Sequence, residues 1–260
     1  MKQTFLILIF GFLAASCSNS SNSHIQLKDF VDDVSVQKLG QELIDLPYGL
    51  NALESGLSES EEILVAVHGS RSQGYEWVYP LKSINSLKKE MYFYRWPDQG
   101  CFAEPAEKLI KDISNILSEN PSLNKVILIG HSYGGILVSD VLKKWTNKTP
   151  IEAHIIASPL AGSNLLINTC NYSPIKKIKA NATLFEWRTQ HQLDSAFKNT
   201  SPNPQEISII GSSITVLPDT YKGNRLGHNW SISWVADEAF DYIFWTFASL
   251  NFSAFVNLVE

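Results

Sequence analysis

A serine flanked by glycines at the end of an apolar run places the strongest constraint on how this chain folds. Residues Gly130 to Gly134 read Gly-His-Ser-Tyr-Gly, directly after the apolar run 126–129 and before a helical pattern over 134–145. A sharp turn from strand to helix lifts such a serine hydroxyl clear of the backbone, and side chains at the two glycines would collide with the neighbouring strand and helix. The pattern therefore predicts that Ser132 is a nucleophile on a strained turn.

Short apolar runs alternate with helical patterns along most of the chain. The run 63–67 is rich in branched residues and too short for a helix, as expected of a strand buried on both faces. Further strands are predicted at 48–53, 91–95, 126–129, 152–157, 182–188 and 207–217. Helices are predicted at 104–117, 134–145 and 233–250, with 24–45 partly helical. This alternation predicts an α/β fold with a doubly wound, mostly parallel sheet covered on both faces.

Length and charge limit the domain count and the partners. A chain of 260 residues suits one sizeable core, which we expect over residues 31–260. The formal net charge is −5, and the sequence has no basic cluster, which argues against nucleic acid as a partner. No His, Cys and Asp set has ligand spacing, so we expect neither a metal nor an organic cofactor. We also expect a monomer.

The N-terminus has the features of a targeting segment. Lys2 precedes an apolar run from Phe5 to Leu13, which is shorter than the about 20 residues that cross a bilayer as a helix. Small residues then lead into Cys17, an arrangement that resembles the signal of bacterial lipoproteins, although Ala14 stands where that family prefers Leu. The alternative is an ordinary secretory signal cut near Ser16.

The lipoprotein resemblance implies a set of expectations for the first 30 residues. Residues 1–16 would be a signal peptide, Cys17 would carry the lipid, and 17–30 would be a polar, lipid-anchored tether. Because Ser18 rather than Asp follows the cysteine, the resemblance implies a bacterial cell envelope protein anchored in the outer membrane. Two other cysteines remain, Cys101 and Cys170, which outside the cytoplasm form either a disulfide or two unpaired buried thiols.

A second glycine turn follows the predicted strand 63–67. His68-Gly69-Ser70 at this place resembles the α/β-hydrolase superfamily, in which a His-Gly turn after an early strand supplies part of an oxyanion hole. The resemblance implies that the backbone N–H groups of Ser70 and Tyr133 hold the oxyanion. His68 itself is interpreted as a structural support rather than a catalytic base.

The same resemblance implies a base and an acid after the serine, in the order Ser, acid, His. Of the histidines that follow Ser132, His154 lies in a predicted strand, which leaves His191 and His228. His228 sits in a turn after the last predicted strand and before the last helix, where the superfamily places its base. We therefore predict His228 as the base.

The predicted acid is Asp194, which lies just past the predicted strand 182–188. Its task would be to fix the imidazole tautomer and stabilise the imidazolium. Asp219 competes but comes from the same loop as His228, Glu186 lies within the strand, and Asp98 precedes the serine. These three remain alternatives.

The segment 156–163, Ile-Ala-Ser-Pro-Leu-Ala-Gly-Ser, resembles a strand-end motif of bacterial lipases and of the lipase-like GPI inositol deacylase group. Only about twenty residues separate Leu160 from the next predicted strand, so we expect a minimal core without a large cap domain. An exposed nucleophile of this kind suits ester groups of bulky or interfacial molecules, with Tyr133, Leu160 and Leu165 as possible walls of an acyl groove.

The expected function is a lipase-like or esterase-like serine hydrolase whose substrate is an ester or a lipid. The same residues could support peptidase, thioesterase or acyltransferase chemistry, since fold and triad do not choose among these. From a different class, the chain could be a catalytically silent envelope binding lipoprotein that kept the fold.

Overall fold

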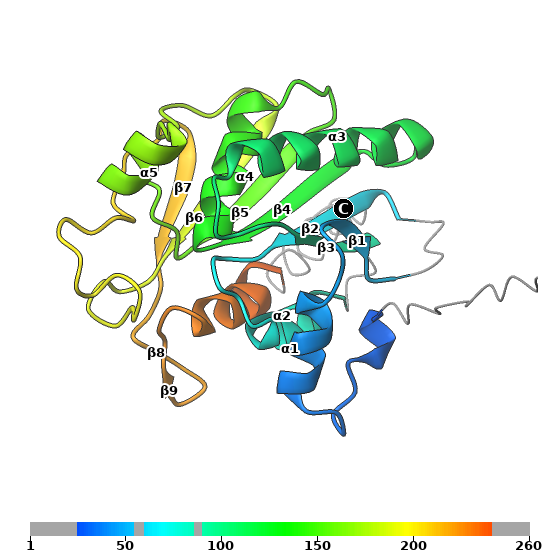
Figure 1. The fold of residues 1–260 in the computed structure, drawn as a ribbon, viewed down its shortest axis with the longest axis horizontal. Helices are drawn as coiled ribbons and strands as arrows, with labels where there is room; N and C mark the ends of the chain where they lie inside the picture. The colour runs from blue at the N-terminus through cyan, green and yellow to red at the C-terminus, as the bar shows by residue number, and fades with distance from the viewer. Residues whose placement is uncertain (1–24, 55–59, 86–89, 241–260) are drawn as a thin grey trace, which may run out of the picture.

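A seven-stranded sheet forms the centre of the fold (Figure 1). The computed structural model describes residues 25–54, 60–85 and 90–240. The strand order is β1-β3-β2-β4-β5-β6-β7, in which β1 is antiparallel to β3 and the other neighbours are parallel. The strands are β1 (Gly49–Ala52), β2 (Glu62–Val67), β3 (Glu90–Arg95), β4 (Lys125–His131), β5 (Ile151–Ile156), β6 (Ala182–Arg188) and β7 (Ser212–Val216). The prediction of a mostly parallel α/β sheet is confirmed.

Helices cover both faces of this sheet. α3 (Ala103–Glu119) and α4 (Tyr133–Lys144) lie on one face, while α1 (Val36–Ile44) and α2 (Tyr75–Asn85) lie on the other with the helical residues 230–240, drawn in orange in Figure 1. The sheet therefore separates two apolar clusters, one under each helical layer. Burial of strand residues on both faces explains why the strands read as continuous apolar runs.

All predicted strands but one begin and end within two residues of their predicted bounds. β7 covers only the second half of the predicted range 207–217. The last helix is described from residue 230 to 240, and the rest of the predicted helix 233–250 lies outside the described residues. A short hairpin of β8 (Thr220–Tyr221) and β9 (Asn224–Arg225) follows β7 and was not expected.

Two helices lack a sequence signal that would have identified them. α2 contains Pro80 in its interior, a position where proline removes a hydrogen bond and normally argues against a helix. Its buried Trp77 and Leu81 pack into the core cluster beneath the sheet, and this tertiary packing outweighs the local preference. α5 (Asn164–Cys170) buries none of its residues, so it has no apolar periodicity.

The predicted tether 17–30 includes residues that belong to the folded domain. Ile25, Leu27 and Phe30 are buried in the same cluster as α1 and α2, and the Leu27 N–H donates to the carbonyl of Leu53 at 2.9 Å. A 3₁₀ turn, η1 (Leu27–Asp29), forms here. In the sequence these three apolar residues are separated by polar ones, so they form no recognisable apolar run. Cys17 and the predicted signal peptide 1–16 lie outside the described residues.

Register brings the two glycine turns to one edge of the sheet. β2 and β4 are parallel neighbours, with Val67 opposite Gly130, so the residues that follow each strand leave the sheet side by side. The chain passes from β2 to β3 on one side and from β4 to β5 on the other, which makes this pair the point where the strand order reverses. In open α/β sheets ligands bind in the crevice at such a point, beyond the carboxyl ends of the strands.

Candidate active site

Ser132 stands in a strained backbone conformation between β4 and α4. Its φ is 54° and its ψ is −121°, a combination that L-residues rarely adopt. Its N–H donates to the carbonyl of Ile156 at 2.9 Å, which ties the turn to the end of β5. The sharp turn predicted from the motif is present, and the serine heads the N-terminus of a buried helix, where developing negative charge is favoured.

The glycines of the turn make room for neighbouring backbone. A Cβ on Gly134 would lie 2.3 Å from the carbonyl oxygen of Val67, and a Cβ on Gly130 would lie 2.9 Å from the carbonyl oxygen of Gly134. Both distances are too short for real carbon contacts, and the first involves backbone of the adjacent strand. The turn therefore packs against the end of β2 only because these positions lack side chains.

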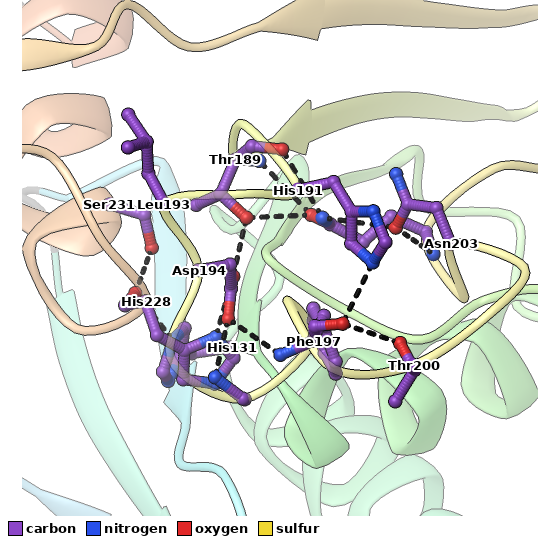
Figure 2. A network of polar contacts seen from close by, with 12 residues as sticks. His131, Thr189, His191, Leu193, Asp194, Phe197, Thr200, Asn203, His228 and Ser231 are labelled. Atoms are coloured by element: carbon purple, nitrogen blue, oxygen red, sulfur yellow. Dashed lines mark hydrogen bonds and ion pairs between the residues drawn. The ribbon is translucent and has the colours of Figure 1, made fainter.

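His228 and Asp194 meet beside this turn. The Nδ1 of His228 lies 2.9 Å from Oδ2 of Asp194, although 34 residues separate them in the sequence. Asp194 is fully buried and follows β6, whereas His228 precedes the helical residues 230–240. Figure 2 shows the Asp194 carboxylate between the His228 ring and the loop that begins at Thr189.

Several donors hold the Asp194 carboxylate in place. The Thr189 hydroxyl donates to Oδ2 at 2.5 Å, and the backbone N–H groups of Ala196 and Phe197 donate to Oδ1 at 2.8 and 3.2 Å. Burial raises the pKa of Asp194, but the bonds from His228, Thr189 and Ala196 outweigh burial and hold the pKa below its usual value. The carboxylate is thus kept charged and oriented toward the imidazole.

His131 links the serine turn to the histidine loop. Its Nε2 donates to the backbone carbonyl of His228 at 3.1 Å, and the two rings lie 4.6 Å apart between centroids. Burial, followed by the nearby charge of His228, lowers the pKa of His131 well below its usual value, so His131 is neutral. Ser231 also donates its hydroxyl to the His228 carbonyl.

Ser132 and His228 line one small cavity of about 160 Å³, which we call the nucleophile pocket. The structure records no hydrogen bond between the Ser132 hydroxyl and the His228 ring. The wall of the nucleophile pocket is mainly polar, and Ser70, Arg71 and Glu76 contribute to it. The two residues predicted as nucleophile and base therefore share one pocket, with the acid behind the base.

The turn after β2 borders the same pocket. Ser70 lies on its wall, and a Cβ on Gly69 would lie 2.9 Å from the Cβ of Ser132, so the two turns are in close contact. Tyr133 is the first residue of α4, where backbone N–H groups have no partner within the helix. This places the two predicted oxyanion donors, on Ser70 and Tyr133, in segments that flank Ser132.

His68 supports this turn, as interpreted from the sequence. It is fully buried, its Nε2 accepts from the Arg95 guanidinium at 2.7 Å, and its Nδ1 lies 2.9 Å from the carbonyl of Gly69. Nδ1 must then carry the proton. Burial, opposed by the bond to Gly69 and aided by Arg95, lowers the pKa of His68 to about 4.

The other candidate residues have different partners. His154 is buried and lies 3.0 Å from Glu152, while Nε2 of His191 lies 2.7 Å from the carbonyl of Phe197. Asp98 accepts from the backbone N–H of Arg71 at 2.5 Å. Asp219 is exposed, and Glu186 is buried in a pair with Arg188 at 2.6 Å. Among the candidate acids it is Asp194 that the structure places against His228.

A disulfide joins Cys101 to Cys170 near this edge of the sheet. It connects the segment before α3 with the last residue of α5. Beside it, the Tyr133 hydroxyl donates to the carbonyl of Gly100 at 2.9 Å. The bridge therefore fastens the loop next to the first residue after Ser132.

The expected acyl groove of Tyr133, Leu160 and Leu165 is not assembled. Leu160 is buried in the core, Leu165 is 72% exposed, and Tyr133 packs against Trp96. The larger cavity beside the nucleophile pocket is instead lined from α2, β8 and the helical residues 230–240. This cavity could not be predicted from the sequence, because α2 has no recognisable sequence signal.

The part of the chain that the structure describes contains neither a metal-binding cluster nor a membrane-spanning helix. There, no cluster of three or more His, Cys, Asp or Glu side chains could hold a metal ion. In the same ranges, no helix combines the length and the apolar character needed to cross a bilayer.

Sequence reasoning missed three residues that hold the candidate triad. The serine motif identifies His131 only as a neighbour of the nucleophile, and no sequence pattern marks Thr189 or Gln205. Gln205 accepts from the Thr189 N–H at 3.0 Å, which fixes the loop that carries Asp194. The one available signal was the position of His131 directly before the nucleophile.

Comparison with known proteins gives a structural likeness without a sequence match. No family model and no curated protein sequence matches this chain. The fold is similar to a mature lipase of Bacillus licheniformis, with a TM-score of 0.52 and 12% identity over 76% of this chain and 98% of that one. It is also similar to lipase B of Aspergillus fumigatus, with a TM-score of 0.50 and 13% identity over 65% of this chain and 48% of that one.

Between β5 and β6 the described chain carries the short helix α5, in keeping with a core that lacks a large cap. At 12–13% identity the likeness to these lipases establishes the fold and nothing finer. The strand order, the turn at Ser132 and the likeness to these two lipase structures agree: the chain has the α/β-hydrolase fold.

Proposed function

We propose that this chain is a serine hydrolase that cleaves carboxylic esters through Ser132, His228 and Asp194. The observation that carries the proposal is the 2.9 Å contact between Asp194 and His228 at the pocket that also contains Ser132. A buried carboxylate, an imidazole and a serine on a strained turn form the arrangement that activates a hydroxyl nucleophile.

The contact also assigns the imidazole tautomer. Because the charged Asp194 accepts a hydrogen bond, Nδ1 of His228 carries the proton and Nε2 presents a lone pair. In the proposed reaction, Nε2 takes the proton of the Ser132 hydroxyl while Oγ bonds to the ester carbonyl carbon. The proton then passes to the leaving alcohol, and an acyl-enzyme remains.

Deacylation repeats these steps with water. His228 takes a proton from water, the resulting hydroxide attacks the acyl carbon, and the proton returns to Oγ of Ser132 as the acid leaves. In both halves the backbone N–H groups of Ser70 and Tyr133 would bind the negative oxygen, which is worth about 3 kcal/mol of barrier for each well-placed donor.

Covalent labelling tests the proposal directly. A fluorophosphonate probe should form an adduct on Ser132 in the purified full chain and none in Ser132→Ala. Ser70→Ala is the matched control, because it removes a serine hydroxyl from the same pocket and keeps the backbone N–H. Absence of an adduct on Ser132 in the wild-type protein would end the proposal and favour a silent binding protein.

A substrate panel separates ester cleavage from the other reactions of the same residues. Matched esters, thioesters, amides and acyl acceptors should show the highest kcat/KM for esters. Faster turnover of thioesters or amides would replace esterase by thioesterase or peptidase. Product accumulation that depends on an added alcohol would indicate an acyltransferase.

For location, we propose a lipid anchor on Cys17 that holds the protein in the bacterial outer membrane. The support is the sequence: a short apolar run from Phe5 to Leu13, small residues, then Cys17 followed by Ser18. Cys17→Ala should release the protein from membrane fractions, whereas Ser18→Ala should leave it bound. Unchanged partitioning of Cys17→Ala would contradict the anchor.

A further inference from the structure

A second cavity borders the nucleophile pocket. It encloses about 420 Å³ and is lined mainly by Val36, Tyr75, Tyr79, Tyr221 and Trp230, and we call it the aromatic groove. Tyr75, Glu76 and Asn229 line both cavities, so the groove begins where the nucleophile pocket ends. A substrate bound at Ser132 can therefore extend from one cavity into the other.

The junction of the two cavities contains a carboxylate with an unused acceptor. Glu76 is 9% exposed, and its Oε1 accepts from the Ser72 hydroxyl. Its Oε2 is buried and has no hydrogen-bond partner among the described residues. Leaving a buried carboxylate oxygen unpaired is unfavourable, and Glu76 lines both cavities. The groove therefore favours an occupant that donates a hydrogen bond to Glu76.

A lysine on the wall of the groove argues that this donor is neutral. The Lys222 ammonium lies 4.5 Å from the ring centroid of Tyr79 and 4.9 Å from that of Tyr221. Lys222 also pairs with Asp237 at 2.8 Å. A lysine cation thus already lies over these two rings, so they offer no free cation–π site to a ligand ammonium group, and a neutral hydroxyl suits the groove better.

The other rings offer flat apolar surface. Tyr75 and Trp230 are 40% and 44% exposed, so their faces are accessible from solvent. The Asn229 amide donates to the Tyr75 hydroxyl at 3.3 Å and lines both cavities. Exposed aromatic faces next to a hydrogen-bond acceptor suit a ring that has an apolar face and a polar edge.

We propose that the aromatic groove binds a neutral, hydroxylated ring of the ester substrate, with the ring against Tyr75 and Trp230 and a hydroxyl donating to Oε2 of Glu76. This specificity rests on the proposed ester hydrolysis at Ser132. The ring could belong to a hydroxyaryl acyl group or to a sugar that supplies the alcohol. Both present an apolar face and a hydroxyl donor.

Matched substrates test the hydroxyl. The acyl arm compares methyl para-hydroxyphenylpropanoate with its phenyl and para-methoxyphenyl analogues, which lack the donor. The alcohol arm compares a methyl glucoside acetylated on its primary hydroxyl with cyclohexylmethyl acetate. We expect at least one hydroxylated member to be preferred about tenfold or more in kcat/KM, as one hydrogen bond to a charged group provides. The arm that shows the preference identifies the source of the ring.

Substitution of Glu76 separates recognition from a structural role. Glu76→Met removes the acceptor and should abolish the preference, while Glu76→Gln removes the charge and should reduce it in part. Glu104 is the matched control, since it is the second residue of α3 as Glu76 is of α2, and it is exposed. Glu104→Met and Glu104→Gln should keep the wild-type preference. A purely structural Glu76 would lower turnover of both members of a pair equally.

The aromatic wall has its own control. Trp230→Ala should raise KM for the hydroxylated ring substrates about tenfold and leave KM for a small acetate ester unchanged. Tyr48→Ala removes an exposed ring, 65% accessible, that lines neither the aromatic groove nor the nucleophile pocket, and it should change nothing.

Binding of inert amide analogues, measured by calorimetry on the full chain, tests the groove independently of turnover. The hydroxylated amide should bind about tenfold more tightly than its donor-free partner. If Ser132 takes up no fluorophosphonate but this difference is present, the groove stands and the esterase proposal fails. Equal binding and equal kcat/KM within every pair, or a preference that survives Glu76→Met, would overturn the inference.

Discussion

His131, the residue directly before the nucleophile, donates a hydrogen bond from its buried Nε2 to the backbone carbonyl of His228 at 3.1 Å. The serine turn thus holds the loop that carries the proposed base. The Ser231 hydroxyl donates to the same carbonyl, and the rings of His131 and His228 lie in contact.

His131→Phe keeps a ring and removes this donor. We expect kcat to fall at least about tenfold, because a small displacement of the base is costly in rate, and the unfolding free energy to fall by about 1 kcal/mol. Ser231→Ala is the control: it removes the other donor to the same carbonyl but leaves the link to the serine turn. Steady-state kinetics and urea unfolding measure both effects, and equal kcat for the two variants would contradict a positioning role for His131.

Asp194→Asn should lower kcat about 10⁴-fold, because the amide cannot hold His228 in the tautomer that leaves Nε2 free. Asp219→Asn should change kcat less than about twofold, since Asp219 is exposed. Steady-state hydrolysis of one ester by the two variants makes the comparison. Equal losses would refute the assignment of the acid.

Acid should affect the stability of the protein partly through Asp194. Because its folded pKa is lowered, the carboxylate contributes stability that is present above the unfolded pKa of about 3.9 and is lost as the pH falls through the folded pKa. Between about pH 6 and pH 3, the wild type should therefore lose more unfolding free energy than Asp194→Asn. Urea unfolding at each pH measures this, with Asp219→Asn expected to follow the wild type.

Gly134→Ala should destabilise the fold by about 3 kcal/mol and remove activity, since the new Cβ would lie 2.3 Å from the Val67 carbonyl. Gly100→Ala is the matched control, because the nearest atom to its Cβ would be 3.6 Å away. Thermal unfolding should separate the two variants clearly. A Gly134→Ala protein with wild-type stability would show that the turn is not packed as described.

Loss of the Cys101–Cys170 disulfide should lower the unfolding free energy by about 2–4 kcal/mol, because the bridge closes a loop of 69 residues in the unfolded chain. The double variant Cys101→Ser, Cys170→Ser should melt earlier than the oxidised wild type and match the reduced wild type. Non-reducing peptide mapping provides the direct check, and separate alkylation of both cysteines would contradict the bridge.

The strands and the serine turn could be predicted because their signals are local. Val126 to Ile129 are apolar since both faces of β4 are covered, and Gly130 and Gly134 are small since backbone passes close to them. α2 could not be predicted in this way. Its Pro80 argues against a helix, and packing of residues such as Trp77 and Leu81 under the sheet stabilises it.

The α/β class and the position of Ser132 could be predicted from local patterns, because hydrophobic periodicity and glycine turns are properties of neighbouring residues. The order in which an acid and a base follow Ser132 came instead from the resemblance to the α/β-hydrolase superfamily. The folded chain is needed to show that Asp194 rather than Asp219 lies against His228, and that α2 and β8 form a groove beside the nucleophile. These relations join segments far apart in the chain, and their geometry depends on strand order and register, which no local pattern contains.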